Sequence, residues 1–573
     1  MSESTPDLAN TTAPSQGPDP ASPVRPDVDE PGDSTDDPAY GTAAAEPSRT
    51  SARTLARAGL VVSATYLLSR ILGYVETVIV TTTFGAGSDL GAFNAAFRIP
   101  DLIFQLVAAG AVASALLPMV GSLLANGEQA RAWRVLSTVA NLMLVGFAGL
   151  AAIGFVAAPF LVPTVIAPGF DAPTMSRTID LTRIMLLGPM LLALSAVVTS
   201  GLNADRRFAA SAVAPIVYNL AIIAAAVFLS SSLGITGLAL GVVVGSLGHL
   251  LVQLPSLYRA GFRYVPGIDL GDEDARRALL LMGPRVLGLG ASQITIVVMV
   301  ALASGFGPGA VTDWTLAFTL LQIPLGVIGI PLGIVIFPSL ARELAVGRTE
   351  LYLQLVSRSL RILLWVMLPI AAMGMALRFQ TVDLLLGYGK MDPANLRLTA
   401  DTLLLFLLGL GAHASIGVLA RAFYARHDTR TPVAAAILAV VVNTTLAWLL
   451  VGSIGLPALG LAIAIAAWIE ALALLWILSR REAGLDIRGV ASVGLRSLVA
   501  SAAAGVVATV VAGGVGRIFG HVDPGKLLDL AEAVAAAAAG SAVYLVLSAA
   551  LRITELGTMV AIVGDLVRRR GRA

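Results

Sequence analysis

The sequence predicts an all-α membrane protein with about fourteen transmembrane helices, arranged as two parallel six-helix lobes followed by two C-terminal helices. Three observations support this class: the composition, a series of long apolar segments and an internal repeat. Of the 573 residues, 57% are hydrophobic and only 13% are charged. The mean hydropathy is +0.84. A soluble globular chain has about 25% charged residues, so a soluble fold is excluded.

The composition also argues against several functions. The net charge of +2 gives no electrostatic signal for a nucleic-acid partner. The chain has no cysteine, which excludes disulfides, thiolate metal sites and a cysteine nucleophile, and its four histidines are well separated. We therefore expect a transporter and not an enzyme, with no metal site and no cofactor.

Residues 1–52 differ from the rest of the chain. They are rich in Pro, Ser and Thr, with ten acidic residues against two arginines. Such a segment buries too little apolar area to offset its ordering entropy, so we expect a disordered cytoplasmic tail. It also lacks the basic segment, apolar core and cleavage site of a signal peptide.

Fourteen apolar runs follow, each long enough to cross a bilayer, which requires about 20 residues. They lie near residues 56–83, 91–123, 133–160, 180–202, 209–231, 235–258, 278–305, 311–340, 355–377, 399–422, 432–453, 456–479, 492–515 and 528–551. Several contain proline, which transmembrane helices tolerate as a kink.

The loops between these runs alternate in charge. Every second loop is rich in arginine, as in "NADRR" and "RAFYARHDTR", and the chain ends in "DLVRRRGRA". The intervening loops, such as "GAGSD" and "SSSLG", are mostly uncharged. Because basic loops stay on the cytoplasmic side, both termini are predicted to be cytoplasmic.

Segments of the first half recur in the second half. The stretch "FRIPDLIFQL" around Pro100 recurs as "LQIPLGVIGI" around Pro324. A second stretch, which ends at Asn219, recurs with its end at Asn443, and the two pairs have the same spacing along the chain. Since each copy holds an even number of helices, both copies enter the membrane from the same side, which predicts a parallel repeat with the site between its halves.

The repeat divides the chain into five parts. We expect a tail at 1–52, an N-terminal lobe at 53–262, a C-terminal lobe at 273–482, two helices at 491–553 and a basic cytoplasmic tail at 554–573. A further pair supports this division, because His249 and Glu470 follow Gly234 and Gly455, the glycines that open their spans, at the same spacing. We interpret His249 and Glu470 as helix-packing groups.

Polar side chains within the apolar runs are the candidate substrate-binding residues. Charge at membrane depth is costly, so it is either functional or sheltered by protein. The candidates lie on the first two helices of each lobe, which can converge on one cleft: Arg70, Glu76, Arg98, Asp101, Gln105, Arg285, Gln293 and Gln322. A cleft with several arginines suits a phosphorylated, anionic substrate.

Structural roles stay open for some of these residues. Arg98 and also Arg183 could extend to the membrane interface without touching a substrate. Glu76 could serve as the salt-bridge partner of a neighbouring arginine.

Several segments resemble one known family. These are "SRILGYVETVIVTTTFGAG" (69–87), "GLNADRRFAASAVAPIVYN" (201–219) and "QIPLGVIGIPLGIVIFPSLAREL" (322–344). They are similar to the MurJ/MviN family, the lipid II flippases of the MOP exporter superfamily, and the match is collinear from about residue 58 to 482. The resemblance implies a MOP-type protein of the bacterial cytoplasmic membrane. It would move an undecaprenyl-pyrophosphate-linked peptidoglycan precursor outward by alternating access. It also implies a lipid-linked anionic substrate, contact with membrane lipids and association with cell-wall synthesis enzymes.

The chain departs from the family pattern at the predicted cavity. Arg70 keeps the family's arginine, and Arg98 keeps the charge of a family lysine. Other positions where the family has charged residues are uncharged or changed in sign here: Glu76, Thr77, Gly91, Phe104, Gln105, Ala109, Thr319 and Gln322. Arg285 could replace some of the lost positive charge.

Three functions therefore compete at the level of sequence. The first is a lipid II flippase. The second is a MOP-superfamily exporter of another polyprenyl-linked glycan or of a small cation, which Glu76 favours slightly. The third is a non-transporting scaffold for cell-wall enzymes, with the acidic tail as its docking segment. Coupling to an ion or to the membrane potential is open in each case, and the sequence identifies no coupling ion.

Overall fold

The computed structural model describes residues 49–107, 111–269, 271, 276, 293–519 and 525–559. Within these ranges the secondary structure is helical and contains no strand. Contacts divide the chain into Met1–Leu55 and Ala56–Ala573, and the description below concerns the second unit. Most of the predicted acidic tail and the last fourteen residues lie outside the described ranges.

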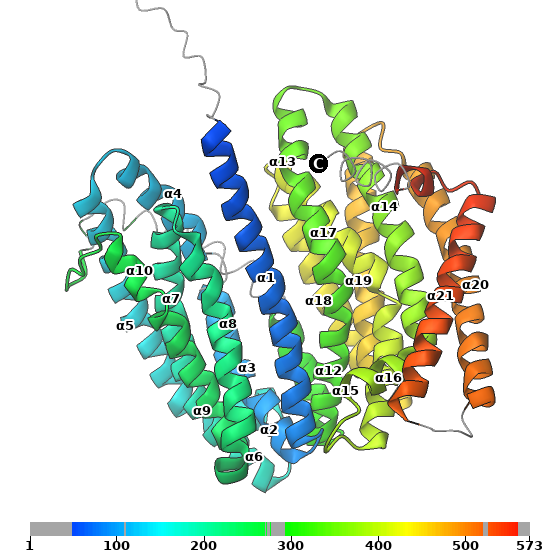
Figure 1. Cartoon of the computed structure of the whole chain (residues 1–573), viewed down its shortest axis with the longest axis horizontal. Coiled ribbons are helices and arrows are strands. Elements are labelled where there is room, and N and C mark those ends of the chain that lie inside the picture. Colours follow the sequence, from blue (N-terminus) through cyan, green and yellow to red (C-terminus); the bar gives the residue numbers. More distant parts are fainter. Residues whose placement is uncertain are drawn as a thin grey trace, which may run out of the picture. The chain divides into compact units, whose positions relative to one another are not determined.

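The first bundle contains the helices that follow α1 up to residue 259. Figure 1 shows α1 running between this bundle and the next. The bounds are α1 Arg49–Phe84, α2 Ser88–Ala96, α3 Arg98–Val107, α4 Ala111–Ala125, α5 Gln129–Leu161, α6 Ala172–Met185, α7 Leu187–Ala204, α8 Phe208–Ala224, α9 Ser230–Leu251 and α10 Leu254–Arg259. Asn219 on α8 donates a hydrogen bond from Nδ2 to the Ser69 carbonyl oxygen at 3.1 Å, which ties α1 to the first bundle.

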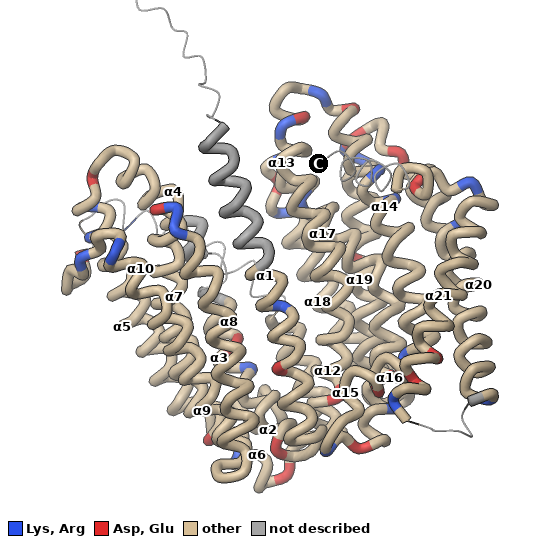
Figure 2. Tube along the Cα trace, viewed as in Figure 1, with Lys and Arg blue, Asp and Glu red and all other residues tan. Residues whose placement is uncertain are grey.

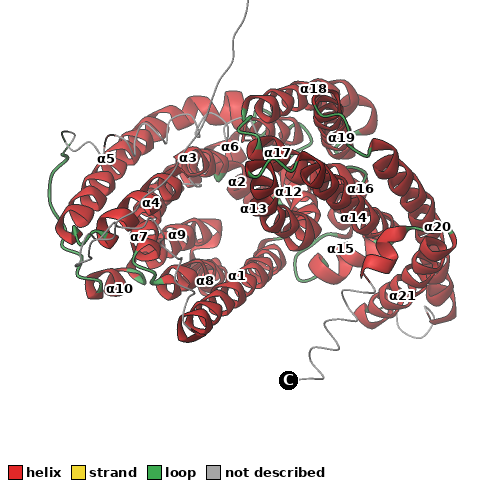
Figure 3. Cartoon of the chain, turned by 90° about the horizontal axis from the view of Figure 1, so that it is seen from above, coloured by secondary structure: helices red, strands yellow, loops and turns green. Residues whose placement is uncertain are grey.

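The described part of the second bundle begins at Gln293, in the apolar helical segment Gln293–Ser304. Its other bounds are α12 Pro308–Pro324, α13 Ile330–Ala345, α14 Thr349–Ala376, α15 Arg378–Leu386, α16 Pro393–Leu407, α17 Leu410–Ala425, α18 Arg430–Ile454 and α19 Pro457–Arg481. The C-terminal pair, α20 Ile487–Phe519 and α21 Lys526–Ala550, packs beside α14 (Figures 1 and 3). Small residues such as Ala500, Ala504 and Ala508 are buried along α20 and allow this close approach.

The structure confirms the helical membrane class but not the number of spans. In the described residues, ten helices are long and apolar enough to cross a membrane, or eleven if the pair α16 and α17, bent by 47°, counts as one span. The prediction of fourteen is not confirmed. Two predicted runs, 209–231 and 235–258, correspond to α8 and α9, which pack against each other across a non-helical turn at Gly234 but count together as the one segment Phe208–Arg259 among the ten. Much of the run 278–305 lies outside the described residues.

Backbone conformation repeats between the two bundles. Arg206 and His427 have φ angles of 59° and 58°, in the left-handed region that non-glycine residues seldom adopt. Gly234 has φ 56° and ψ −140°, and Gly455 has φ 76° and ψ −153°. The interval along the sequence from Arg206 to His427 equals the interval from Gly234 to Gly455. These matches support the proposed parallel repeat, although the predicted lobe boundaries themselves stay a prediction.

The two bundles meet at the end of the molecule where α1 finishes. Nδ2 of Asn395 donates to the Ala86 carbonyl oxygen at 2.9 Å. Nδ2 of Asn94 donates to Oγ1 of Thr312 at 3.2 Å, and the backbone N–H of Gly169 donates to Oγ of Ser304 at 3.0 Å. Figure 2 shows charged residues collected toward the ends of the helices and few along their middle. The bundles are therefore joined at one end by short polar contacts.

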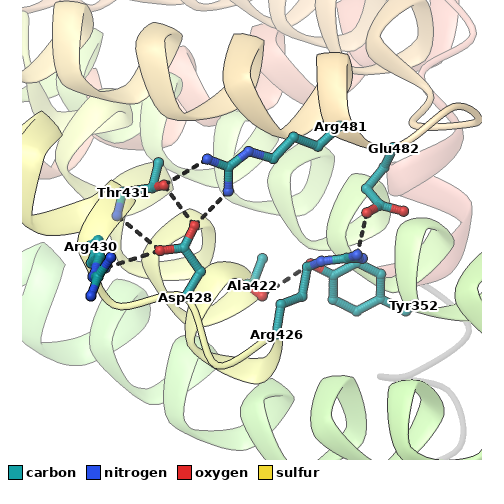
Figure 4. A network of polar contacts seen from close by, with 8 residues as sticks. All are labelled: Tyr352, Ala422, Arg426, Asp428, Arg430, Thr431, Arg481 and Glu482. Atoms are coloured by element: carbon teal, nitrogen blue, oxygen red, sulfur yellow. Dashed lines mark hydrogen bonds and ion pairs between the residues drawn. The ribbon is translucent and has the colours of Figure 1, made fainter.

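A polar network holds the second bundle together at the opposite end. Figure 4 shows Asp428, in the turn between α17 and α18, surrounded by donors. Its carboxylate accepts from the backbone N–H groups of Arg430 and Thr431, both at 3.0 Å. It also accepts from the Thr431 hydroxyl at 2.6 Å and from Arg481 at 2.5 Å. These hydrogen bonds, led by that of the Thr431 hydroxyl, lower the pKa of Asp428 to about 2. In the same network, Arg426 pairs with Glu482 beside Tyr352.

We expect Asp428→Asn to lower the melting temperature of the purified protein in detergent. A hydrogen bond to a charged group contributes about 1.5–3 kcal/mol, and asparagine keeps the cap but loses the ion pair. Because the folded pKa is below the unfolded one, this stabilisation is present above about pH 4 and is lost as the pH falls toward 2. The difference between the two proteins should therefore be constant at neutral pH and shrink below about pH 4.

Asp392→Asn is the matched control. Asp392 caps α16 by accepting from the Ala394 N–H at 2.9 Å, and among the described residues it has no ion pair. Asparagine caps a helix about as well as aspartate, so this variant should melt close to the parent protein. Equal losses for both variants would contradict the role assigned to the Asp428 ion pair.

Candidate functional site

A cavity of about 620 Å³ lies between the first and second bundles. Its wall is formed by α3, the helix Gln293–Ser304 and α12, together with α17, α18 and α19. The lining residues are Arg98, Asp101, Gln105, Gln293, Thr295, Ile296, Trp314, Phe318, Gln322, His413, Ala436, Ala439, Val440, Asn443, Ile463, Ala466, Ala467 and Glu470. The wall therefore combines a few polar groups with an apolar surface, as ligand pockets commonly do.

Helix α3 supplies the polar groups of the first bundle. Arg98, Asp101 and Gln105 are spaced by three and four residues, so they lie on one face of the helix and all three line the cavity. The Arg98 guanidinium donates to the Asn94 carbonyl oxygen at 3.1 Å and to Oγ1 of Thr315 on α12 at 3.4 Å. Gln105 donates to the Asp101 carboxylate at 3.4 Å. Arg98 thus points into the space between the bundles and not toward a membrane interface.

Five of the eight predicted site residues line this one cavity: Arg98, Asp101, Gln105, Gln293 and Gln322. Three of them precede α4 and two belong to the second bundle, so they are far apart in sequence. The packing of two bundles against each other brings them together. Their part in substrate binding stays a prediction. Arg285 lies outside the described residues.

The two charged residues of α1 lie apart from the cavity wall. Arg70 is exposed and reaches toward the second bundle, where a methyl group added to Gly326 would lie 3.6 Å from its Nη1 atom. Gly326 follows Gln322 by one helical turn, so Arg70 is near the cavity without lining it. Glu76 is half-buried, and no ion pair joins it to an arginine among the described residues. The structure thus gives no salt-bridge partner to Glu76 in these ranges.

Two other polar residues have structural surroundings. Arg183 donates to the Phe155 carbonyl oxygen at 3.3 Å and lies 4.7 Å from the centre of the Phe155 ring, away from the cavity lining. His249 lies 2.7 Å from the Ser195 hydroxyl through Nδ1. Gln253 donates to the same hydroxyl at 2.6 Å. This agrees with the interpretation of His249 as a packing residue.

The sequence did not single out three of the groups that shape the cavity. Trp314 and Phe318 are stacked with centroids 5.4 Å apart and planes within 5°, and they form an aromatic wall. His413 lines the cavity from α17. A histidine inside an apolar run was the available signal for it. Glu470, which the sequence assigned to packing, also lines the cavity.

The structure gives local reasons for some departures from the family pattern. Phe104 lines a separate cavity of about 30 Å³ inside the first bundle and not the main one. Thr319 donates its hydroxyl to the Thr315 carbonyl oxygen at 2.8 Å. Gly91 packs against the backbone of Pro308, and a Cβ at this position would collide with the Pro308 carbonyl oxygen. Ala109 lies outside the described residues.

Two helical bundles that share a polar cavity and touch at one end define a helical membrane protein with the MOP-type fold. Residues 80–522 match the family model described as "Lipid II flippase MurJ". The chain belongs to this family.

Relatives of known sequence agree with this assignment. The chain is 33% identical over 421 residues to the "Probable lipid II flippase MurJ" of Rhizobium tropici, covering 72% of this chain and 79% of the relative. It is 30% identical over 438 residues to the "Lipid II flippase MurJ" of Burkholderia cenocepacia, covering 74% and 84%.

Solved structures show the same fold. The chain resembles "Lipid II flippase MurJ, inward closed conformation" with a TM-score of 0.70 and 21% identity, covering 85% of this chain and 98% of that one. It also resembles an inward-facing multidrug resistance MATE family transporter of the MOP superfamily, with a TM-score of 0.58 and 17% identity, covering 72% and 94%.

We expect Gly91→Ala to weaken the contact between the bundles at this end, because the added Cβ would overlap the Pro308 carbonyl oxygen. The chain has no cysteine, so a single cysteine placed at Ala436 on the cavity wall reports access to the cavity. Labelling of this cysteine by a membrane-impermeant maleimide, added from the side of the bundle contact, should become several-fold faster in Gly91→Ala.

Gly87→Ala is the control for this measurement. Gly87 precedes the same helix, and a Cβ there would meet no atom within 4 Å. Its labelling rate should equal that of the parent. If Gly91→Ala also labels at the parental rate, the contact at Pro308 does not limit opening.

Proposed function

We propose that this protein flips lipid II, the undecaprenyl-pyrophosphate-linked peptidoglycan precursor, across the bacterial cytoplasmic membrane by alternating access. The observation that carries the proposal is the cavity between the two bundles, with Arg98 in its wall and Arg70 near its edge, in a chain of the MurJ family. The enzymes that make or polymerise such a precursor are the expected partners.

The cavity residues suit the two ends of such a substrate. The guanidinium groups of Arg98 and Arg70 each present a planar set of donors that matches pyrophosphate oxygens. The amides of Gln105, Gln293 and Gln322 offer both donors and acceptors for sugar hydroxyls. The contacts of Arg98 with Asn94 and Thr315 hold its charge at the boundary of the two bundles, where a bound anion would touch both.

Export of a small cation is the second candidate. It is favoured by the two carboxylates on the cavity wall, Asp101 and Glu470. The two functions differ in the sign of charge that the cavity must stabilise. A labelling experiment distinguishes the two functions. The substrate is the compound, lipid II or an organic cation, that protects a cysteine in the cavity from labelling.

Arg70→Ala should slow lipid II flipping strongly in reconstituted vesicles while leaving folding and expression near normal. Arg70 is exposed, so its removal opens no cavity in the packed core. The loss of a charge-assisted hydrogen bond, about 1.5–3 kcal/mol, corresponds to about a 10- to 100-fold slower rate. Arg70→Lys should recover only part of the rate, because lysine lacks the planar fork.

Glu76→Gln is the internal control on the same helix. Six residues separate it from Arg70, about 240° around the helix, so we expect a mild effect. The opposite result, normal flipping in Arg70→Ala and none in Glu76→Gln, would favour the cation exporter. Complementation of a flippase-depleted strain provides the matching cellular measurement.

Both termini should be cytoplasmic. The proposal rests on the arginine-rich loops, which recur at the same end of the helices as Asp428 and Arg481. Reporter fusions at Asp171 and Gly271 should report the outer and the cytoplasmic side, respectively. The same side for both fusions would show that the order of the spans is wrong.

A further inference from the structure

Glu470 is an isolated carboxylate on the cavity wall. It projects from α19, and its neighbours on the wall from that helix are Ile463, Ala466 and Ala467. The side chain is half-buried, and no hydrogen bond or ion pair joins it to another described residue. A charged group at membrane depth that has no partner is costly. Such a group either binds a proton or meets water.

The matching position in the first bundle has a different environment. Gly234 and Gly455 share one unusual backbone conformation, and His249 and Glu470 follow them at the same spacing. His249 is held by the Ser195 hydroxyl, which also accepts from Gln253. The first bundle therefore satisfies its polar group within the helix packing.

The second bundle has no polar residues at the positions that match these partners. At the spacing that relates the two glycines, Ser195 corresponds to Ile416 and Gln253 corresponds to Leu474. Glu470 is thus an ionisable residue at a position where the matching neighbours, Ile416 and Leu474, are apolar. A packing role does not explain a carboxylate in these surroundings, because an alanine or leucine would pack there at no electrostatic cost.

His413 on α17 lies on the same cavity wall. Its Nε2 atom is shielded from solvent and has no hydrogen-bond partner in the described part of the chain. The side-chain amide of Asn443 on α18, also on the wall, is buried and lacks a partner within the same ranges. Three polar groups from three helices thus have unused hydrogen-bonding capacity at one cavity.

Other titratable groups lie on this wall or on the helices packed against α19. Across the cavity, Arg98 contacts Asn94 and Thr315, and Asp101 accepts from Gln105. On α12, Asp313 is buried and accepts from Thr399 at 3.1 Å, while its second oxygen has no partner among the described residues. The helices packed against α19 contribute Arg397 and Asp401 on α16, Arg421 and Tyr424 on α17, and Arg430 on α18. Asp401 is paired with Arg378 at 3.3 Å, and Arg421 donates to the Gly417 carbonyl oxygen at 2.7 Å.

We propose that Glu470 and His413 form a proton-binding site in the second bundle, and that protonation of Glu470 permits the cavity to close. A hydronium ion in the cavity water transfers its proton to a carboxylate oxygen of Glu470 and becomes neutral water. The neutral acid then lies among the alanines without an unpaired charge. In the open, hydrated cavity the O–H bond breaks, and the proton returns to water. The nitrogen lone pair of His413 stabilises the acid by accepting its hydrogen bond.

The link from this site to transport rests on the proposed function, but proton binding itself is measured without lipid II. Infrared difference spectra of the full chain in lipid nanodiscs, recorded against pH, should show a carboxylic-acid C=O band that titrates. The band should vanish in Glu470→Gln and persist with a shifted midpoint in Glu470→Asp. His413→Gln should shift the midpoint while keeping the band. In Asp313→Asn the band and its midpoint should be unchanged.

Closure is followed in the same variants through a cysteine placed at Ala436. In the parent protein its labelling rate, corrected for ionisation of the thiol, should differ several-fold between low and high pH. In Glu470→Gln the ratio of the two rates should be near one, because the neutral amide mimics the protonated state at every pH.

Two results would overturn the proposal. One is a titrating band and a pH-dependent labelling rate that survive in Glu470→Gln. The other is their loss in Asp313→Asn, which would assign the proton to α12. If the pH response is found while lipid II is not transported, the proton site stands and the flippase assignment fails. If lipid II is transported at equal rates in the parent and in Glu470→Gln across pH, the coupling fails and the flippase assignment stands.

Discussion

The backbone contact between the two bundles at the end of α1 is the constraint on which the site depends. Gly91 lies against Pro308, and Gly309 lies so close to the Ala86 carbonyl oxygen that an added Cβ would be 2.6 Å away. Glycine allows backbones to approach where any side chain would separate them. Because close-packed interfaces deform little and tend to adopt discrete arrangements, this contact favours either a closed or an open end. The cavity is therefore closed at this end only while Gly91 stays in contact with Pro308 and Gly309 with Ala86.

Electrostatics oppose that closure. A cavity that shuts around ionised groups removes them from water, and each unpaired charge costs several kcal/mol. Arg98 avoids much of this cost through its bonds to Asn94 and Thr315. Glu470 has no such bonds within the described residues. The balance between backbone contact and desolvation thus depends on the charge state of a few wall residues, which a bound anion or a proton can change.

Periodicity and charge in the sequence were sufficient to predict the fold class and five of the cavity residues. Apolar runs identify helices because the membrane demands them, and a repeat identifies the cleft between its halves. The non-helical turn at Gly234 separates α8 from α9, as the gap between the runs 209–231 and 235–258 predicts, whereas much of the run 278–305 lies outside the described residues. The sequence could not place Arg70 beside Gly326 or His413 on the wall, because both depend on how helices from different bundles rotate and pack.

The cavity has fewer charged residues than the family pattern, so the fold by itself does not identify the substrate. In the described structure the MOP scaffold is held by glycine contacts, by buried alanines such as Ala500 and Ala504, and by the Asp428 network, and these residues lie outside the cavity lining. Folding therefore tolerates uncharged residues on the wall, such as Gln105 and Gln322 in place of charged ones, while the electrostatic character of the wall changes with each one. Among the described residues, the wall has one arginine, two carboxylates, one histidine and several amides. A dianionic pyrophosphate in such a wall would rely on Arg98 together with Arg70, and it would be repelled by an ionised Glu470. In that case, binding of the anionic substrate favours protonation of Glu470 through charge alone. This coupling does not depend on how far the helices move.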